Sequence, residues 1–227
     1  MKSILIIGGS RGIGRAILEQ QVVENKVIVF SRGEIDFEHQ NLIHFQLDAI
    51  KDELPDLEAV DHLVYCPGSI NLKPFNRLKL DDFSSDFEIN VLGAIRLIQY
   101  YLPKLKNGQN PSIVLFSSVA AKLGMPFHTS IAIAKAGVES LVKSFGAEYA
   151  TSIRINAIAP TLTNTDLASH LLKNETAIEN MIQRHPMKKI LQPSEVADLA
   201  DFLLSEKSKS ITGQVFELDC GIVSFKI

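Results

Sequence analysis

Residues 4–17 read "ILIIGGSRGIGRAI" and join an apolar run to a helical pattern through a glycine-rich turn. Gly8, Gly12 and Gly14 lack side chains, which allows a tight turn, close approach of the backbone to a pyrophosphate, and close helix-to-strand packing. A pyrophosphate would bind at the positive N-terminus of the helix. The order strand, turn and helix therefore predicts a dinucleotide site at the start of a βαβ unit. The candidate contacts in this turn are Gly8, Ser10, Arg11, Gly12, Ile13 and Gly14.

The same alternation continues along the chain. Short apolar, β-branched runs lie at 3–7, 26–30, 42–47, 62–66, 112–116, 153–158 and 214–218, and segments with helical period lie at 12–24, 81–104, 129–150 and 194–204. Strands that alternate with helices predict right-handed crossovers and a parallel sheet covered on both faces. We therefore expect one Rossmann-like, doubly wound α/β domain of about seven strands over residues 1–227. The second and third runs lie too close together for a crossover helix, so a turn or loop is expected there.

The composition points to a small-molecule ligand. The formal net charge is −3 over 227 residues, which gives no electrostatic reason to expect nucleic acid or an anionic membrane as a partner. No apolar run approaches the roughly 18 residues of a transmembrane helix, so we expect a cytoplasmic protein. Cys66 and Cys220 are far apart and have no metal-like spacing, which favours reduced thiols and predicts no metal site.

The end of the second apolar run bears on the choice of cofactor. Ser31 and Arg32 follow "VIVF" and offer donors and positive charge, as Arg11 does in the glycine turn. A 2′-phosphate matches these groups better than a 2′-hydroxyl, which an acidic residue would bind. The sequence therefore favours NADP(H) over NAD(H). Carboxylates close by leave open the alternative that Arg32 is simply solvated.

Residues 161–192 form the longest insertion and carry apolar side chains at roughly helical spacing. The insertion follows a strand end, where ligands bind in such sheets. Two interpretations stay open: a mobile lid over an apolar substrate, or an ordinary packed pair of helices.

Several motifs together resemble those of the short-chain dehydrogenases/reductases, in their single-domain ketoreductase form. The resemblance covers nearly the whole chain and rests on "GGSRGIG" (8–14), "INVLGAI" (89–95), "IVLFSSVAA" (113–121), "AKAGVESLVKSFGAEYA" (134–150), "RINAIAPTLTNTDL" (154–167), "PSEVADLADFLLS" (193–205) and "ITGQVFELDCG" (211–221). It implies an oxidoreductase that forms a homodimer or homotetramer. Apolar positions on more than one face of 81–104 and 129–150 favour the same assembly.

The resemblance also implies a catalytic group of Asn, Ser, Tyr and Lys. The serine bonds the substrate carbonyl oxygen, the tyrosine gives the proton, the lysine bonds the nicotinamide ribose and lowers the tyrosine pKa, and the asparagine holds a water. Asn90, Ser118 and Lys135 match this group. Ile131 stands at the tyrosine position, four residues before Lys135, and an isoleucine has no proton to give.

Further cofactor contacts follow from the same resemblance, with some departures. They are Asp48, Gly68, Lys135, Pro160, Thr163 and Thr165, of which Asp48 bonds the adenine edge or is a surface carboxylate. The family's "NNAG" is "YCPG" at 65–68, its "PG" glycine is Thr161, and the first residue of its glycine motif is Ile7.

His128 is the candidate to replace the missing acid. It lies seven residues before Lys135, so the two share a helix face if the helix already includes residue 128. The enoyl reductase branch of the superfamily has its acid at this spacing. Pro126, Thr129 and Ser130 are helix-start signals, however, so a substrate contact or an uninvolved loop histidine are equally open.

Three functions compete. The first is an NADP(H)-dependent reductase of a carbonyl or activated alkene, with the proton from His128, from the substrate or from water. The second is a catalytically inactive NADP(H)-binding protein, such as a redox sensor or an assembly subunit. The third, an interaction module without nucleotide, is disfavoured by the glycine turn.

Overall fold

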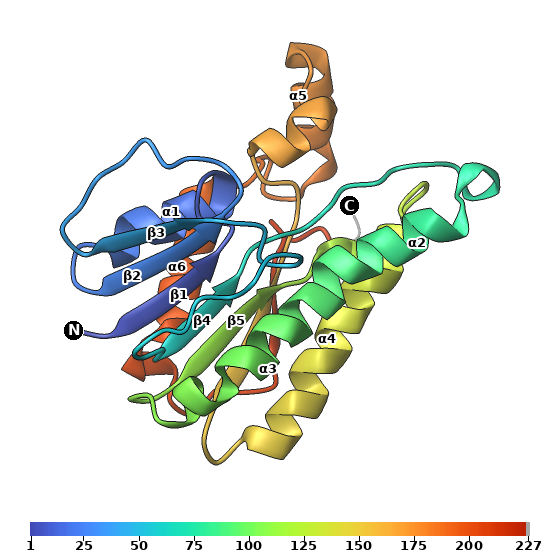
Figure 1. The fold of residues 1–227 in the computed structure, drawn as a ribbon. Helices are drawn as coiled ribbons and strands as arrows, with labels where there is room; N and C mark the ends of the chain where they lie inside the picture. The colour runs from blue at the N-terminus through green and yellow to red at the C-terminus, as the bar shows by residue number, and fades with distance from the viewer. Residues whose placement is uncertain (226–227) are drawn as a thin grey trace.

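The apolar runs form seven parallel strands in a computed structural model that describes residues 1–225 (Figure 1). The strands are β1 (Ser3–Ile7), β2 (Lys26–Ser31), β3 (Leu42–Gln46), β4 (His62–Tyr65), β5 (Ser112–Phe116), β6 (Arg154–Pro160) and β7 (Val215–Leu218). They lie in the order β3-β2-β1-β4-β5-β6-β7. Every residue of β1, β4 and β5 is buried, as expected for a sheet covered on both faces. The predicted doubly wound fold is confirmed.

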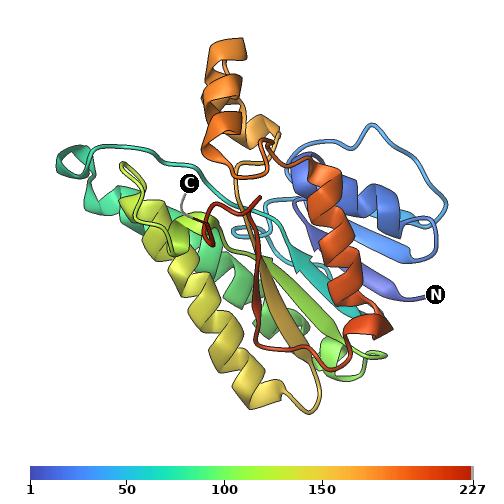
Figure 2. The same ribbon diagram turned by 180° about the vertical axis from the view of Figure 1, so that it is seen from behind.

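Two helical layers cover the sheet (Figures 1 and 2). Helices α1 (Gly12–Gln21) and α6 (Pro193–Leu204) pack on one face, where Ile4 and Ile6 of β1 join their apolar side chains. Helices α2 (Leu80–Phe87), α3 (Gly93–Lys106) and α4 (Thr129–Tyr149) lie on the other side of the sheet. There Leu5 and Ile7 of β1 pack in one apolar cluster with side chains of α3 and α4. Alternate residues of one strand thus stabilise opposite layers.

The predicted helices are present, with one interruption. The segment predicted as a single helix over 81–104 consists of α2, a π-helical turn η2 (Glu88–Leu92) and α3. Short 3-10 turns lie at η1 (Phe75–Arg77), η3 (Val119–Ala121), η4 (Asp166–Leu171) and η5 (Glu206–Ser208). The connection from β2 to β3 contains no helix, as expected. None of the described helices has the length and apolar character needed to cross a bilayer.

Helix α5 (Glu175–Arg184) stands above the carboxyl ends of the strands, away from the sheet (Figure 1). None of its residues is buried. The insertion that carries it is closed at its base, because the Asn164 amide donates to the Leu191 carbonyl at 2.8 Å and the Leu191 amide to the Leu162 carbonyl at 3.1 Å. Residues 161–192 thus form a tied loop that projects over the strand ends.

The strand order reverses between β1 and β4, and in such sheets a ligand crevice opens at this point. The glycine turn lies there, with positive φ at Gly8 (81°) and Gly12 (59°). Gly14 fits for a different reason. A Cβ on Gly14 would lie 2.3 Å from the Gly8 carbonyl oxygen, so α1 approaches the end of β1 too closely for any side chain.

Gly14→Ala therefore tests this close approach. Because the new methyl would meet backbone and not a flexible side chain, we expect a loss of at least about 2 kcal/mol in the free energy of unfolding. Urea denaturation measures it. Gly124→Ala is the matched control, since a Cβ there meets no atom within 4 Å, and its effect should stay within about 0.5 kcal/mol. Equal effects of the two substitutions would contradict the close approach.

Candidate active site

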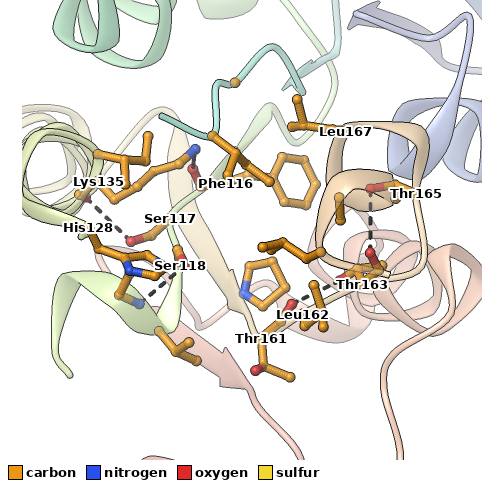
Figure 3. A pocket seen from close by; sticks show the side chains of 18 of the residues that line it. Phe116, Ser117, Ser118, His128, Lys135, Thr161, Leu162, Thr163, Thr165 and Leu167 are labelled. Carbon is orange, nitrogen blue, oxygen red and sulfur yellow. Dashed lines mark hydrogen bonds between the residues drawn. The ribbon is translucent and has the colours of Figure 1, made fainter. Parts of the chain in front are cut away.

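A cavity of about 240 Å³ lies at the carboxyl ends of the strands (Figure 3). Its lining is mainly apolar and includes side chains from the tied loop above the sheet. The candidates from the sequence that line it are Ile13, Gly68, Ser118, His128, Lys135, Pro160, Thr163 and Thr165. The remaining candidates lie outside this lining, in the glycine turn, at the ends of β2 and β3, and at Asn90 behind the wall.

Lys135 supplies the one buried amine of the cavity wall within residues 1–225. Its side chain projects from α4, and Nζ donates to the Phe116 carbonyl at the end of β5 at 2.8 Å (Figure 3). Burial lowers the pKa of Lys135 to about 8, although the carboxylate of Asp86 and the thiol of Cys66 act in the opposite direction. The amine is thus mainly protonated below that pH, and it loses its proton within reach of neutral conditions.

Ser118 and Ile131 face the same cavity. Ser118 caps η3, where its Oγ accepts from the Ala120 amide at 3.2 Å. That bond does not use the hydroxyl proton, which remains for an acceptor in the cavity. Ile131 lies one helical turn before Lys135 on α4 and is buried in the wall. An apolar side chain therefore fills the place beside Lys135.

His128 lines the cavity but lies just outside the helix. Helix α4 begins at Thr129, and His128 is its N-cap. Only the carbonyl of His128 joins the helix hydrogen bonds, by accepting from the Ala132 amide at 2.8 Å. The ring Nδ1 lies 2.7 Å from the Pro126 carbonyl. A carbonyl only accepts, so Nδ1 carries the proton of the neutral ring and Nε2 is an acceptor.

Asn90 is buried in the π turn, behind the inner wall of the cavity. Its Nδ2 donates to the Asp86 carbonyl at 2.8 Å and to Ser69 Oγ at 3.0 Å. Its Oδ1 has no hydrogen-bond partner among the described residues. A Cβ on Gly68 would lie 3.3 Å from that oxygen and 3.5 Å from Lys135 Nζ. The missing side chain of Gly68 thus leaves a shared space between the amide and the amine.

Tyr65 explains why the π turn forms where Asn90 sits. The Tyr65 hydroxyl donates to the Ile89 carbonyl at 2.6 Å, and the Gly93 amide bonds the Glu88 carbonyl five residues back. A Cβ on Gly93 would lie 2.1 Å from the Tyr65 oxygen, so this glycine leaves room for the ring. The departure from "NNAG" therefore has a structural role. Tyr65 donates to the Ile89 carbonyl, and the helix shifts to the π hydrogen-bond pattern at the turn that carries Asn90.

The glycine turn meets the requirements of a pyrophosphate site. Arg11, the N-cap of α1, makes no side-chain cap, so it does not occupy the amides of the first turn. Those amides and the helix dipole attract an anion. A Cβ on Gly12 would lie 3.4 Å from Thr165 Cγ2, so the loop after β6 closes over the turn. These residues fit a dinucleotide.

The candidates at the ends of β2 and β3 have different surroundings. Ser31 is buried, and its Oγ lies 2.8 Å from both the Gly33 carbonyl and His44 Nε2, so the hydroxyl is already engaged. Arg11 and Arg32 are exposed and make no ion pair within the described residues, and Asp36 pairs with Arg15 at 2.8 Å instead. Asp48 Oδ1 accepts from the Ile50 amide at 3.0 Å and shapes the turn after β3.

A buried histidine that the sequence did not single out ties the projecting loop to the sheet. His185 Nδ1 lies 2.7 Å from the Met181 carbonyl, so Nδ1 carries the proton and Nε2 accepts from the Thr161 hydroxyl, also at 2.7 Å. Thr161 stands where the resemblance expects glycine. The threonine in place of glycine was therefore visible in the sequence. Its hydrogen-bond partner His185 was not, because it lies 24 residues further along the chain.

Comparison with known proteins gives consistent matches. A family model described as enoyl-(acyl carrier protein) reductase matches residues 11–223. The 3-oxoacyl-[acyl-carrier-protein] reductase FabG of Thermotoga maritima is 29% identical over 98% of this chain and 98% of its own length. A tropinone reductase homolog of Datura stramonium is 30% identical over 96% of this chain and 90% of its own length. The solved structure of ElxO with NADP bound has a TM-score of 0.89 at 28% identity, covering 99% of each chain.

Tyr65→Phe tests the origin of the π turn. It removes the hydroxyl that satisfies the Ile89 carbonyl, so we expect a loss of about 1–2 kcal/mol in the free energy of unfolding. Tyr100→Phe is the control, because its hydroxyl also donates to a backbone carbonyl, that of Leu54, but the ring is 47% exposed and water can substitute. If both variants unfold alike in urea, the special role of Tyr65 is contradicted.

Proposed function

Because the chain belongs to the short-chain dehydrogenase/reductase family of oxidoreductases, we propose that it reduces a carbonyl group or activated alkene with NADP(H). The observation that carries this proposal is the convergence of Ser118 and Lys135 on an apolar cavity that the glycine turn also borders. The bound cofactor would supply the hydride. The residues of the chain bind both molecules, exclude water and hold the proton.

Different residues would contact each part of the cofactor. The amides of the glycine turn would hold the pyrophosphate, and Lys135 the nicotinamide ribose. Asp48 would bond the adenine. Contacts from the remaining walls would come from Ile13, Gly68, Pro160, Thr163 and Thr165. Arg11 and Arg32 would hold a 2′-phosphate, because both guanidinium groups are exposed without a carboxylate partner in the described chain.

On the substrate side, Ser118 would donate to the oxygen of the substrate, and Asn90 would place a water through its unpartnered Oδ1. The mainly apolar lining favours an apolar substrate. The loop 161–192 would act as its lid, which the absence of buried residues on α5 and the closed base of the loop support. Ile131 would occupy the place of the family's tyrosine, since it lies one turn before Lys135 in the wall.

We also propose a cytoplasmic homodimer or homotetramer. Large apolar side chains are exposed along one helical layer, at Leu80, Phe87, Leu92, Tyr100 and Ile133. A second copy of the chain would cover them. A monomer in sedimentation velocity experiments would contradict this assembly.

The proposed function is tested by NADPH consumption across aldehydes, ketones and enoyl thioesters, followed by the absorbance of reduced nicotinamide. We expect turnover with at least one class, and a lower KM for NADPH than for NADH. Arg32→Ala should weaken NADPH binding about tenfold or more while leaving NADH nearly unchanged, because a charge-assisted bond to phosphate is lost. Arg77→Ala removes another exposed arginine, in η1, and is the control.

The contrary outcomes are distinct. If NADPH raises the melting temperature but no class of substrate is consumed, the protein is a catalytically inactive NADP(H)-binding protein. If NADPH leaves the melting temperature unchanged, the nucleotide site itself is refuted.

His128 is proposed as a substrate contact, because its ring lines the cavity and its Nδ1 bonds the Pro126 carbonyl, which leaves Nε2 for the substrate. His128→Ala should then raise KM and leave kcat within about threefold of wild type, as expected when uniform binding is lost. A fall in kcat of about 10²–10⁴-fold would instead identify His128 as the general acid. Steady-state kinetics with any substrate found above separate the two.

A further inference from the structure

Asp86 is a buried carboxylate behind the inner wall of the cavity. It lies in the last turn of α2 with 2% of its surface exposed. Its Oδ1 accepts from Ser69 Oγ at 2.6 Å, whereas its Oδ2 is buried and has no hydrogen-bond partner among the described residues. Within residues 1–225 no ion pair includes it. A buried carboxylate with one unpartnered oxygen is costly, so a reason for it within the site is expected.

The chain of contacts from Asp86 leads to Lys135. Ser69, which accepts the amide proton of Asn90 and donates to Asp86, is itself part of the cavity lining. Asn90 Oδ1 and Lys135 Nζ both lie within 3.5 Å of the point where a Cβ on Gly68 would be. Asp86 is close enough to oppose the effect of burial on the pKa of Lys135. The carboxylate therefore acts as a distant counter-charge to the amine.

The other groups around Lys135 do not replace it. Cys66, at the end of β4, is a neutral thiol in the pH range where Lys135 titrates, because burial raises the pKa of Cys66 to about 12. Glu139 of α4 is engaged by Ser117 Oγ at 2.8 Å, and this hydroxyl lies near the backbone carbonyl of Lys135 and not its amine. His128 commits its Nδ1 proton to Pro126. Asp86 is thus the carboxylate that favours the ammonium form of Lys135.

We propose that Asp86 is a positioning residue that keeps the Lys135 amine protonated, so that Lys135 is the proton donor that replaces the missing tyrosine. The inference rests on the proposed function. An N–H bond of the ammonium breaks, its electron pair stays on nitrogen, and the proton forms the new bond on the reduced substrate. The neutral amine regains a proton from water. Ile131, one turn away, has no proton to give.

The first readout does not depend on activity. Competitive labelling with acetic anhydride over a range of pH, followed by mass spectrometry of the peptide that contains Lys135, measures the midpoint of its deprotonation. We expect a midpoint of about 8 in the wild-type protein. In Asp86→Asn, which keeps the shape and removes the charge, the midpoint should fall by about one pH unit, because the ammonium loses its counter-charge.

Two controls accompany this variant. Asp81→Asn makes the same charge change in the exposed first turn of the same helix and should leave the midpoint unchanged. Asp86→Glu keeps the charge, so its labelling midpoint should lie close to that of the wild-type protein. This variant separates the loss of charge from any effect on folding. An unchanged Lys135 midpoint in folded Asp86→Asn overturns the proposal.

The second readout is the pH profile of reduction. Since the ammonium is the active form, the rate of the wild-type protein should fall as pH rises through about 8. In Asp86→Asn the same fall in rate should occur at a lower pH, by as much as the labelling midpoint falls. If the midpoint moves and the rate limb does not, Lys135 is not the donor. Absence of turnover in the wild-type protein is a failure of the proposed function, and labelling still tests whether Asp86 holds the proton on Lys135.

Discussion

The close approach of Gly14 to the Gly8 carbonyl is the constraint on which the rest of the site depends. It brings the N-terminus of α1 against the end of β1, at the point where the strand order reverses. The loop after β6 then closes on the same turn through Thr165. These contacts set one edge of a crevice, and the cavity lined by Ser118 and Lys135 continues from it. A cofactor held at the turn would therefore lie beside the only part of the described chain where a buried amine meets apolar walls.

The second theme is the supply of a proton in a site where an isoleucine, Ile131, lies one helical turn before the buried Lys135. Among residues 1–225 no carboxylate pairs directly with Lys135, and its buried amine donates to the Phe116 carbonyl. Such an environment makes the proton easier to give up than that of an exposed lysine. Asp86, which Ser69 of the cavity wall connects to Asn90, opposes complete loss of the charge. Together, burial and Asp86 adjust one amine to the pH range in which a general acid works best.

The sequence predicts the parts of this arrangement that are local. Strand runs, the glycine turn and three of the four expected helices depend on periodicity and on neighbours along the chain, and all are present. The π turn was not predicted, because its cause is Tyr65 on another element. Likewise, the sequence offered the Ser31 hydroxyl as a donor to a phosphate. In the structure this hydroxyl lies 2.8 Å from Nε2 of His44, on the neighbouring strand β3. His128 was expected either in the helix or in a loop, and the structure places it at the boundary between them. Asp86 and Asn90 are four residues apart, a spacing that puts them on one helix face, yet only Ser69 shows that this face belongs to the site.

The central claim is the proposed hydride transfer by a chain in which Ile131 lies one helical turn before Lys135 in the cavity wall. Its most direct test is the transfer of deuterium from NADPH labelled at the nicotinamide C4, on either face, into a carbonyl or enoyl product analysed by mass spectrometry. The account predicts one deuterium in the product from one of the two labelled faces. A protein that binds the labelled cofactor and yields no deuterated product with any of these substrates would contradict it.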